Sequence, residues 1–144
     1  MKLPQTHFSS SPADTFAFGQ RLAASLRGGD VIALFGDLGA GKTALVQGIA
    51  AGLGVKTKVN SPTFTIMKLY ALRRDMVKQF CHIDAYRLHD ARDLVAIGAG
   101  DYLGAADTIS AVEWAEKTAD LLPPDCWRIT LKLIGPEERE IVVA

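Results

Sequence analysis

The first third of the chain alternates apolar stripes with short polar or glycine-rich turns. A serine followed by a proline at residues 11–12 is a typical helix start, and apolar side chains then recur every fourth position up to the glycine pair at 28–29. Residues 31–35, Val-Ile-Ala-Leu-Phe, form an apolar run without polar alternation, as in a strand buried on both faces. A glycine-rich turn follows, and then a second apolar stripe that ends at Gly54. The pattern therefore predicts a helix, then a strand, a glycine-rich loop and a second helix in direct succession.

The rest of the chain predicts a hairpin, two further helices and three further strands. The hairpin strands are Phe64–Tyr70 and Gln79–Asp84, joined by a polar turn at residues 73–75. The elements expected after it are, in chain order, a helix over Arg92–Leu103, a strand over Thr108–Trp114, a short helix over Glu116–Leu122, and a strand pair formed by Trp127–Ile134 and Glu140–Val143. This order predicts an α/β fold, a three-layer sandwich in which helices flank a mixed, mainly parallel sheet that is parallel in its centre.

Length and composition limit the class of protein. A chain of 144 residues has the length of one ordinary domain, so we expect residues 1–144 to form a single domain. The hydrophobic content of 49% and the charged content of 22% exclude a disordered chain. No apolar stretch approaches the roughly eighteen residues that cross a bilayer, and no secretory signal is recognisable at the N-terminus, so we expect a cytoplasmic protein. Cys81 and Cys126 stand singly in apolar segments and are expected to be reduced core thiols.

The net charge of zero conceals an asymmetry along the chain. Residues 1–87 hold eleven Lys or Arg and five Asp, a net charge of +6, whereas residues 88–144 hold five Lys or Arg and eleven Asp or Glu, a net charge of −6. The first part would favour anions. The alternative is that folding brings the two parts together, so that the charges average out in space.

A phosphate-binding pattern lies between the predicted strand 31–35 and the helix that follows it. Residues 36–43, Gly-Asp-Leu-Gly-Ala-Gly-Lys-Thr, match G-x-x-x-x-G-K-[ST]. The glycines let successive N–H groups and the helix N-terminus converge on phosphate oxygens, while Lys42 adds a full charge and Thr43 offers a hydroxyl to Mg²⁺. The candidate nucleotide-binding residues of this loop are Gly36, Asp37, Leu38, Gly39, Ala40, Gly41, Lys42 and Thr43.

Hydrolysis needs a carboxylate besides this loop, to organise the metal or the attacking water. Asp84 and Glu113 close predicted strands, and parallel strands bring their C-terminal ends to the edge that carries the phosphate-binding loop. The alternative is that Asp84 caps a turn and that Glu113 is solvated. Thr63, in the loop Ser61-Pro62-Thr63-Phe64, could offer a hydroxyl to a γ-phosphate or metal as a switch does.

His82 and Trp114 each admit two interpretations. His82 precedes Asp84 by two residues, so both side chains lie on one face of the strand and could form a metal pair. With no third ligand at a recognisable spacing, a hydrogen-bonded structural histidine is favoured. Trp114 is either a core aromatic or a ring near the nucleotide, and the residues alone favour the core.

Four segments taken together resemble the TsaE family, formerly called YjeE. They are GDLGAGKT at 36–43, SPTF at 61–64, HIDAYRL at 82–88 and VEWAE at 112–116. The family consists of small bacterial P-loop ATPases needed for threonylcarbamoyladenosine in tRNAs that read codons beginning with A. The resemblance covers most of the chain and implies a P-loop NTPase-like fold, ATP and Mg²⁺ as cofactors and slow intrinsic hydrolysis. It further implies association with the proteins TsaD and TsaB, with tRNA reached indirectly through the complex.

The resemblance also implies roles for individual residues. By the family pattern Lys42 contacts phosphates, and Thr43 and Glu113 serve the metal. Asp84 takes the catalytic position that corresponds to Walker B, with Glu113 as the second candidate catalytic carboxylate. Thr63 would be the switch-like hydroxyl.

Around these residues the resemblance implies an aromatic neighbour and a partner surface. Trp114 would lie near the nucleotide, and Tyr86 and Arg87 near both the site and the partner. Ala115 stands where proline is common in the family, which affects no catalytic position.

Two other functions are compatible with a short P-loop domain. A small-molecule kinase would need a lid of arginines over the phosphates, for which Arg73 and Arg74 are candidates, and an acceptor pocket for which the chain has few residues to spare. A regulatory module that binds nucleotide without hydrolysis would tolerate loss of Asp84 and Glu113, yet both are present. The family resemblance favours the ATPase over both alternatives.

Overall fold

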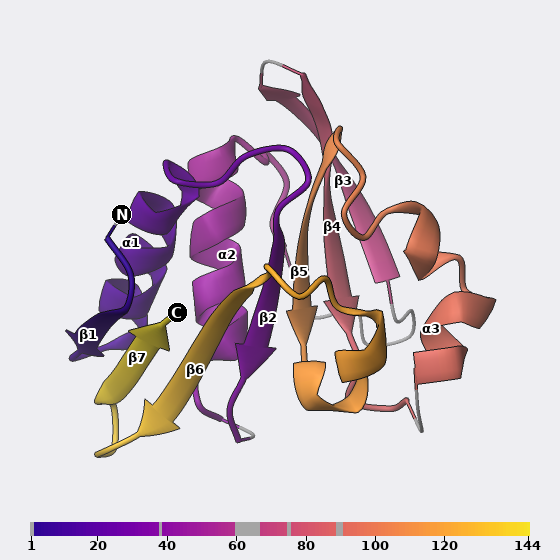
Figure 1. Cartoon of the computed structure of the whole chain (residues 1–144). Helices are drawn as coiled ribbons and strands as arrows, with labels where there is room; N and C mark the ends of the chain where they lie inside the picture. Colours follow the sequence, from indigo (N-terminus) through magenta and orange to yellow (C-terminus); the bar gives the residue numbers. More distant parts are fainter. Residues whose placement is uncertain (1, 38, 60–66, 75, 89–90) are drawn as a thin grey trace.

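The computed structural model describes residues 2–37, 39–59, 67–74, 76–88 and 91–144. The strands in these residues form one seven-stranded sheet in the order β1-β7-β6-β2-β5-β4-β3 (Figure 1). Their bounds are Gln5–Ser9 (β1), Val31–Phe35 (β2), Met67–Arg74 (β3), Val77–Asp84 (β4), Thr108–Glu113 (β5), Trp127–Leu133 (β6) and Arg139–Val143 (β7). Strands β6, β2, β5 and β4 are parallel, and β3, β7 and β1 add antiparallel pairs at the two edges. The predicted mixed sheet with a parallel centre is confirmed.

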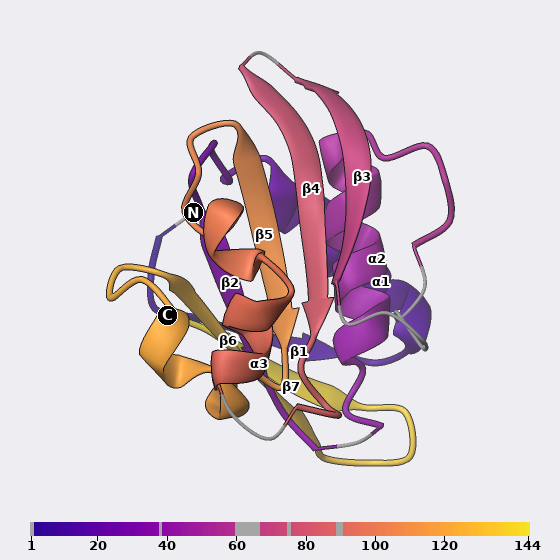
Figure 2. The same ribbon diagram turned by 90° about the vertical axis from the view of Figure 1, so that its right-hand side faces the viewer.

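Helices cover both faces of this sheet, as Figure 2 shows from the side. Helices α1 (Pro12–Ala23) and α2 (Lys42–Leu53) lie on one face. The other face carries α3 (Ala91–Ala96) and the 3-10 turns η1 (Ala99–Asp101), η2 (Ala115–Lys117) and η3 (Ala119–Leu121). Strand β2 is apolar at every position because Ile32 and Leu34 pack under α1 and α2, while Val31 and Ala33 pack into the opposite core.

Helices α1 and α2 approach each other backbone to backbone. A Cβ at Gly19 would lie 2.6 Å from the carbonyl oxygen of Leu45, and a Cβ at Gly52 would lie 2.7 Å from that of Gln20. No side chain fits at either position, so the two glycines set the distance between the helices.

Three predicted elements differ from those observed. The first helix ends at Ala23, before the glycine pair at 28–29 that was expected to end it. The helix expected over Arg92–Leu103 stops at Ala96, because Gly98 adopts a left-handed conformation with φ of 82° and only a 3-10 turn follows. The helix expected over Glu116–Leu122 is replaced by the two 3-10 turns η2 and η3.

Two further comparisons concern β1 and the hairpin. Strand β1 was not predicted, because its five residues carry only weak apolar alternation and it forms through pairing with β7, which is distant in sequence. The hairpin of β3 and β4 is confirmed, but both strands extend further toward the turn than predicted: β3 continues to Arg74, which was expected in the turn, and β4 begins at Val77. Residues 64–66 of the first predicted strand lie outside the described residues. Cys81 and Cys126 are free and buried, as predicted, and burial raises the pKa of the Cys81 thiol to about 12. None of the described helices is long and apolar enough to span a membrane.

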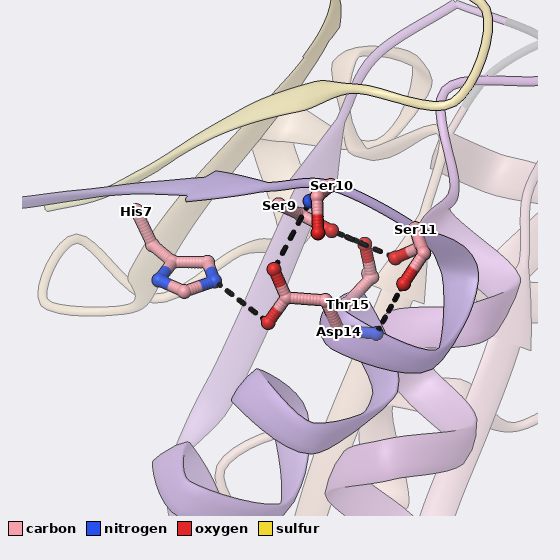
Figure 3. Close-up of polar contacts among 6 residues, drawn as sticks. All are labelled: His7, Ser9, Ser10, Ser11, Asp14 and Thr15. Carbon is pink, nitrogen blue, oxygen red and sulfur yellow. Dashed lines mark hydrogen bonds and ion pairs between the residues drawn. The ribbon is translucent and has the colours of Figure 1, made fainter.

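Strand β1 is joined to the start of α1 by a polar network (Figure 3). Ser11, the residue before the helix, accepts a hydrogen bond on its Oγ from the Asp14 backbone N–H at 3.1 Å, which is the predicted cap. The Asp14 carboxylate lies 3.4 Å from His7 Nε2, and Ser9 Oγ lies 2.6 Å from Thr15 Oγ1. The hydrogen bond from the backbone N–H of residue 10 lowers the pKa of Asp14, with smaller contributions from His7 and Arg21.

Replacing Ser11 by alanine should lower the free energy of unfolding by about 1 kcal/mol, because the Asp14 N–H loses its acceptor. Denaturant unfolding followed by circular dichroism measures this. Ser10→Ala is the matched control, since residue 10 contributes its backbone N–H rather than its side chain. Equal stability of the two variants would contradict the capping role.

Candidate functional site

The loop between β2 and α2 leads into a helix start that has no side-chain cap. Gly41 precedes α2 with φ of 97° and has no side chain to cap the helix. A Cβ at Gly36 would lie 2.7 Å from the carbonyl oxygen of Leu131 in β6, so this end of the loop is wedged against the sheet. An uncapped helix start held in this way is suited to binding an anion.

Lys42 opens α2 and turns its ammonium back over the loop. The residue is only 5% exposed, and its Nζ donates hydrogen bonds to the carbonyl oxygens of Gly36 and of Asp37, the latter at 3.3 Å. The same Nζ lies 3.6 Å from the centroid of the Trp114 ring, within the range of a cation–π contact. Burial lowers the pKa of Lys42, and the carboxylate of Glu113 opposes this. The ammonium is therefore a partly desolvated cation that would gain from an anionic ligand.

The two candidate carboxylates are neighbours in the sheet. Asp84 ends β4 and Glu113 ends β5, and they are paired in register. Glu113 is only 2% exposed: its Oε2 lies 2.5 Å from His82 Nε2, and its Oε1 lies 3.5 Å from Thr43 Oγ1. Glu113 is therefore not the solvated strand end considered as an alternative, and His82 is hydrogen-bonded as the sequence favoured.

Asp84 combines the two interpretations that the sequence left open. Its Oδ1 accepts a hydrogen bond from the Tyr86 N–H at 3.0 Å, so it does cap the turn after β4. The residue also lines the cleft in front of the loop. Burial raises the pKa of Asp84, and the nearby Glu113 raises it further, while the Tyr86 N–H and Lys42 lower it. The turn thus holds the carboxylate in place at the edge of the cleft.

These groups surround a cleft of about 300 Å³. Its lining residues are Gly39, Ala40, Gly41, Lys42, Thr43, Asp84, Tyr86, Glu113 and Trp114. Of the other predicted site residues, Gly36 and Asp37 supply carbonyl oxygens to Lys42, while Leu38 and Thr63 lie outside the described residues. The structure therefore brings together the described part of the predicted site.

Trp114 is held in an unusual conformation at this cleft. Among the described residues other than glycine, it alone has a positive φ, of 58°. Such a conformation costs on the order of 1 to 3 kcal/mol and is often found at functional sites. Its half-buried ring packs against the core on the α3 face of the sheet and against Tyr86, with centroids 5.1 Å apart, and it also lines the cleft, so the ring lies between the core and the cleft. Tyr86 and Arg87 are both exposed next to it.

Arg139 is a residue of this region that the sequence did not indicate. It opens β7, and its guanidinium donates hydrogen bonds to the carbonyl oxygens of Gly39 and Ala40, each at 3.1 Å. No motif contains it, and a single sequence offers no signal that would bring it to a loop about one hundred residues earlier.

The sheet topology brings the positively and negatively charged parts of the chain together. Strand β2, from the positively charged part, lies between β5 and β6 from the negatively charged part. Lys42 and Glu113 accordingly face the same cleft. No group of three or more His, Cys, Asp or Glu that could hold a metal occurs among the described residues.

Comparison with known proteins identifies the family. The family model described as "Threonylcarbamoyl adenosine biosynthesis protein TsaE" matches residues 9–141. The chain belongs to the TsaE family. TsaE from Bacillus subtilis strain 168 is 41% identical over 131 residues, which cover 91% of this chain and 79% of that protein. TsaE from Treponema pallidum is 37% identical over 136 residues, which cover 94% and 97% of the two chains. Both relatives are described as tRNA threonylcarbamoyladenosine biosynthesis proteins.

A solved structure supports the same assignment. The crystal structure of YdiB from Bacillus subtilis superposes with a TM-score of 0.73 at 34% identity, and the match covers 100% of this chain and 87% of that chain. The P-loop NTPase-like fold expected from the TsaE resemblance is therefore confirmed.

Replacing His82 by leucine should lower the free energy of unfolding by about 3 kcal/mol, because the buried carboxylate of Glu113 loses its closest partner. His82→Gln retains a hydrogen-bond donor, so its free energy of unfolding should fall clearly less. Chemical denaturation of the two variants beside the wild type gives the comparison. Equal losses would mean that packing, rather than the contact with Glu113, accounts for the effect of His82.

Proposed function

We propose that this protein is the ATP-binding and ATP-hydrolysing component of the bacterial machinery that makes N6-threonylcarbamoyladenosine in tRNA. The observation that carries the proposal is the arrangement at the cleft, where Lys42 and Thr43 at the start of α2 face Asp84 and Glu113 at the ends of two parallel strands. Family membership supplies the pathway. We propose that the protein acts in the cytoplasm, where bacterial tRNA is modified.

The loop and Lys42 would bind the phosphates of ATP. The N–H groups at the start of α2 need acceptors, and phosphate oxygens supply them. Lys42 would exchange its hydrogen bonds to the carbonyl oxygens of Gly36 and Asp37 for contacts with the phosphates. Trp114, which now lies over the ammonium, would then lie beside the nucleotide.

Thr43 and Glu113 fit a magnesium ion. Both offer oxygen atoms, and Mg²⁺ is usually bound by one or two protein oxygens, with water and phosphate completing its coordination. His82 engages one oxygen of Glu113 and leaves the other directed at Thr43. When bound, the ion would neutralise charge on the phosphates.

Asp84 and Glu113 would serve the hydrolytic step. Water attacks the γ-phosphorus, the bond from that phosphorus to the bridging oxygen breaks, and ADP, phosphate and a proton are released. Asp84 would orient the attacking water by accepting its hydrogen bond, and the raised pKa of this carboxyl suits a proton acceptor. We assign Thr63 a switch-like contact with the γ-phosphate on the family resemblance.

An open cleft favours slow hydrolysis by the isolated chain, because a partner is needed to exclude water and to fix the loops. We propose TsaD and TsaB as the partners, with Tyr86 and Arg87 on the contact surface and tRNA reached through the complex. The two arginines considered as a kinase lid, Arg73 and Arg74, lie at the end of the β3–β4 hairpin that is far from Asp84. Arg74 there donates a hydrogen bond to the carbonyl oxygen of Ala23, which does not favour the kinase alternative.

Lys42→Ala should abolish measurable ATP binding, because the phosphates lose the cation nearest to them; a charge-assisted contact contributes about 1.5 to 3 kcal/mol. Titration calorimetry with ATP and with ADP measures the affinity. Lys56→Ala, which removes an exposed lysine after the far end of α2, is the matched control and should bind as the wild type does. Nucleotide affinity unchanged in Lys42→Ala would overturn the proposed site.

Asp84→Asn keeps the shape of the side chain and removes its charge. The variant should still bind ATP, whereas turnover should fall by at least about tenfold, or 1.4 kcal/mol in the activation barrier. Phosphate release is measured under single-turnover conditions, with binding measured on the same samples. Wild-type turnover in Asp84→Asn would mean that Asp84 is only a turn cap and that Glu113 is the catalytic carboxylate.

A further inference from the structure

Within the described part of the chain, the guanidinium of Arg139 donates its hydrogen bonds to backbone carbonyl oxygens. Its Nε donates to Ala40, its Nη2 to Gly39 and its Nη1 to Glu138, each at 3.1 Å. Among the residues that the structure describes, no carboxylate forms an ion pair with it. Two of the three hydrogen bonds cross from β7 to the phosphate-binding loop, so the side chain joins two segments that are remote in sequence.

Strand β7 does not depend on this contact for its place in the fold. It pairs with β6 on one side and with β1 on the other, and Ile141 and Val143 are fully buried. The loop is the less constrained partner, because Ala40 stands between Gly39 with φ of 82° and Gly41 with φ of 97°. Glycine adopts several backbone conformations at little cost, so peptide planes next to glycine rotate easily unless something holds them.

The chemistry of the peptide unit connects these carbonyl groups to the cleft. In a trans peptide the C=O and the following N–H point in opposite directions. The carbonyl of Gly39 shares its plane with the N–H of Ala40, which donates to the Asp37 carbonyl at 3.0 Å. The carbonyl of Ala40 shares its plane with the N–H of Gly41. Arg139 binds both oxygens from the side of the loop that faces β7 and so keeps the turn closed. Because the Ala40 oxygen points toward Arg139, the Gly41 N–H in the same plane points the opposite way, toward the cleft that Gly41 lines.

Arg139 also acts on the charge of the loop. Carbonyl oxygens carry partial negative charge, and an oxygen that rotated into the cleft would repel a phosphate. The guanidinium neutralises the two oxygens that it binds and adds a full positive charge behind the loop.

We propose that Arg139 is a positioning residue for phosphate binding: it fixes two peptide planes of the loop, so that the turn stays closed and the Gly41 N–H, rather than the Ala40 carbonyl oxygen, faces the phosphates. The inference rests on the proposed nucleotide-binding function. Arg139 is not a catalytic residue, because it acts through Gly39 and Ala40.

The test compares Arg139→Met, which keeps the side-chain stem, with Arg139→Lys, which keeps the charge but not the two-pronged contact. ADP affinity is measured by calorimetry without magnesium, so that the metal site does not contribute. It should fall by about tenfold or more in the methionine variant and by less in the lysine variant, since two hydrogen bonds from a charged donor are lost. The affinity for inorganic pyrophosphate, which lacks base and sugar, is measured by competition with ADP. It should fall by the same factor as the affinity for ADP.

The matched control is Lys132→Met, which removes an exposed positive charge from the neighbouring strand of the same hairpin. It should bind ADP within about twofold of the wild type. A second readout is independent of ligand: the Ala40 amide hydrogen, which is bonded to the Asp37 carbonyl, should exchange faster in Arg139→Met than in the control. Thermal unfolding on the same samples identifies any variant that does not fold. If Arg139→Met is such a variant, the ADP affinity of Arg139→Lys decides instead.

Four results would count against the inference. Wild-type ADP affinity in folded Arg139→Met, or an equal loss in Lys132→Met, would show that the contact with the loop does not matter for phosphate binding. Unchanged exchange at Ala40 would show that Arg139 does not hold the peptide planes. If the wild-type chain itself bound neither ADP nor pyrophosphate, the proposed function would fail, and the inference with it.

Discussion

The first turn of α2 begins without a side-chain cap, because the residue before it is Gly41. The other features of the site follow from this one constraint. Helix N-termini need acceptors for their N–H groups, and a fold that leaves them open must hold the loop in shape by other means. Here the loop is wedged at Gly36 against β6, crossed by the ammonium of Lys42, and bound from outside by Arg139. An anionic ligand is the acceptor for which this arrangement is built.

The acidic side of the cleft obeys a related rule. Glu113 is almost completely buried, which a carboxylate tolerates only with close partners, and His82 and Thr43 supply them from β4 and α2. The strands bring carboxylates to the same edge as the helix start because β2, β5 and β4 are parallel and lie side by side in the sheet. Positive and negative groups thus face each other across the cleft, and contacts from Thr43 to Glu113 and from Lys42 to Trp114 join its two sides.

The sequence predicted those features that depend on neighbouring residues. The strand, loop and helix at 31–54, the hairpin and the sheet-end carboxylates follow from apolar patterning and from a motif whose spacing has a mechanical reason. Features set by distant parts of the chain were missed or misplaced. Strand β1 exists only through pairing with β7, and the contact of Arg139 with the loop joins residues about one hundred positions apart in the sequence. Helix ends were misplaced where glycine and short 3-10 turns compete at small energy differences.

The pairing of β1 with β7 has a consequence for how local opening could spread. In this register Ser9 lies opposite Arg139, so the last residue of the first strand pairs with the residue that holds the phosphate-binding loop. Fraying of residues 5–9 would turn β7 into an open sheet edge and would loosen the backbone from which the guanidinium extends. The segment with the weakest sequence signal is thus mechanically coupled to the loop with the strongest.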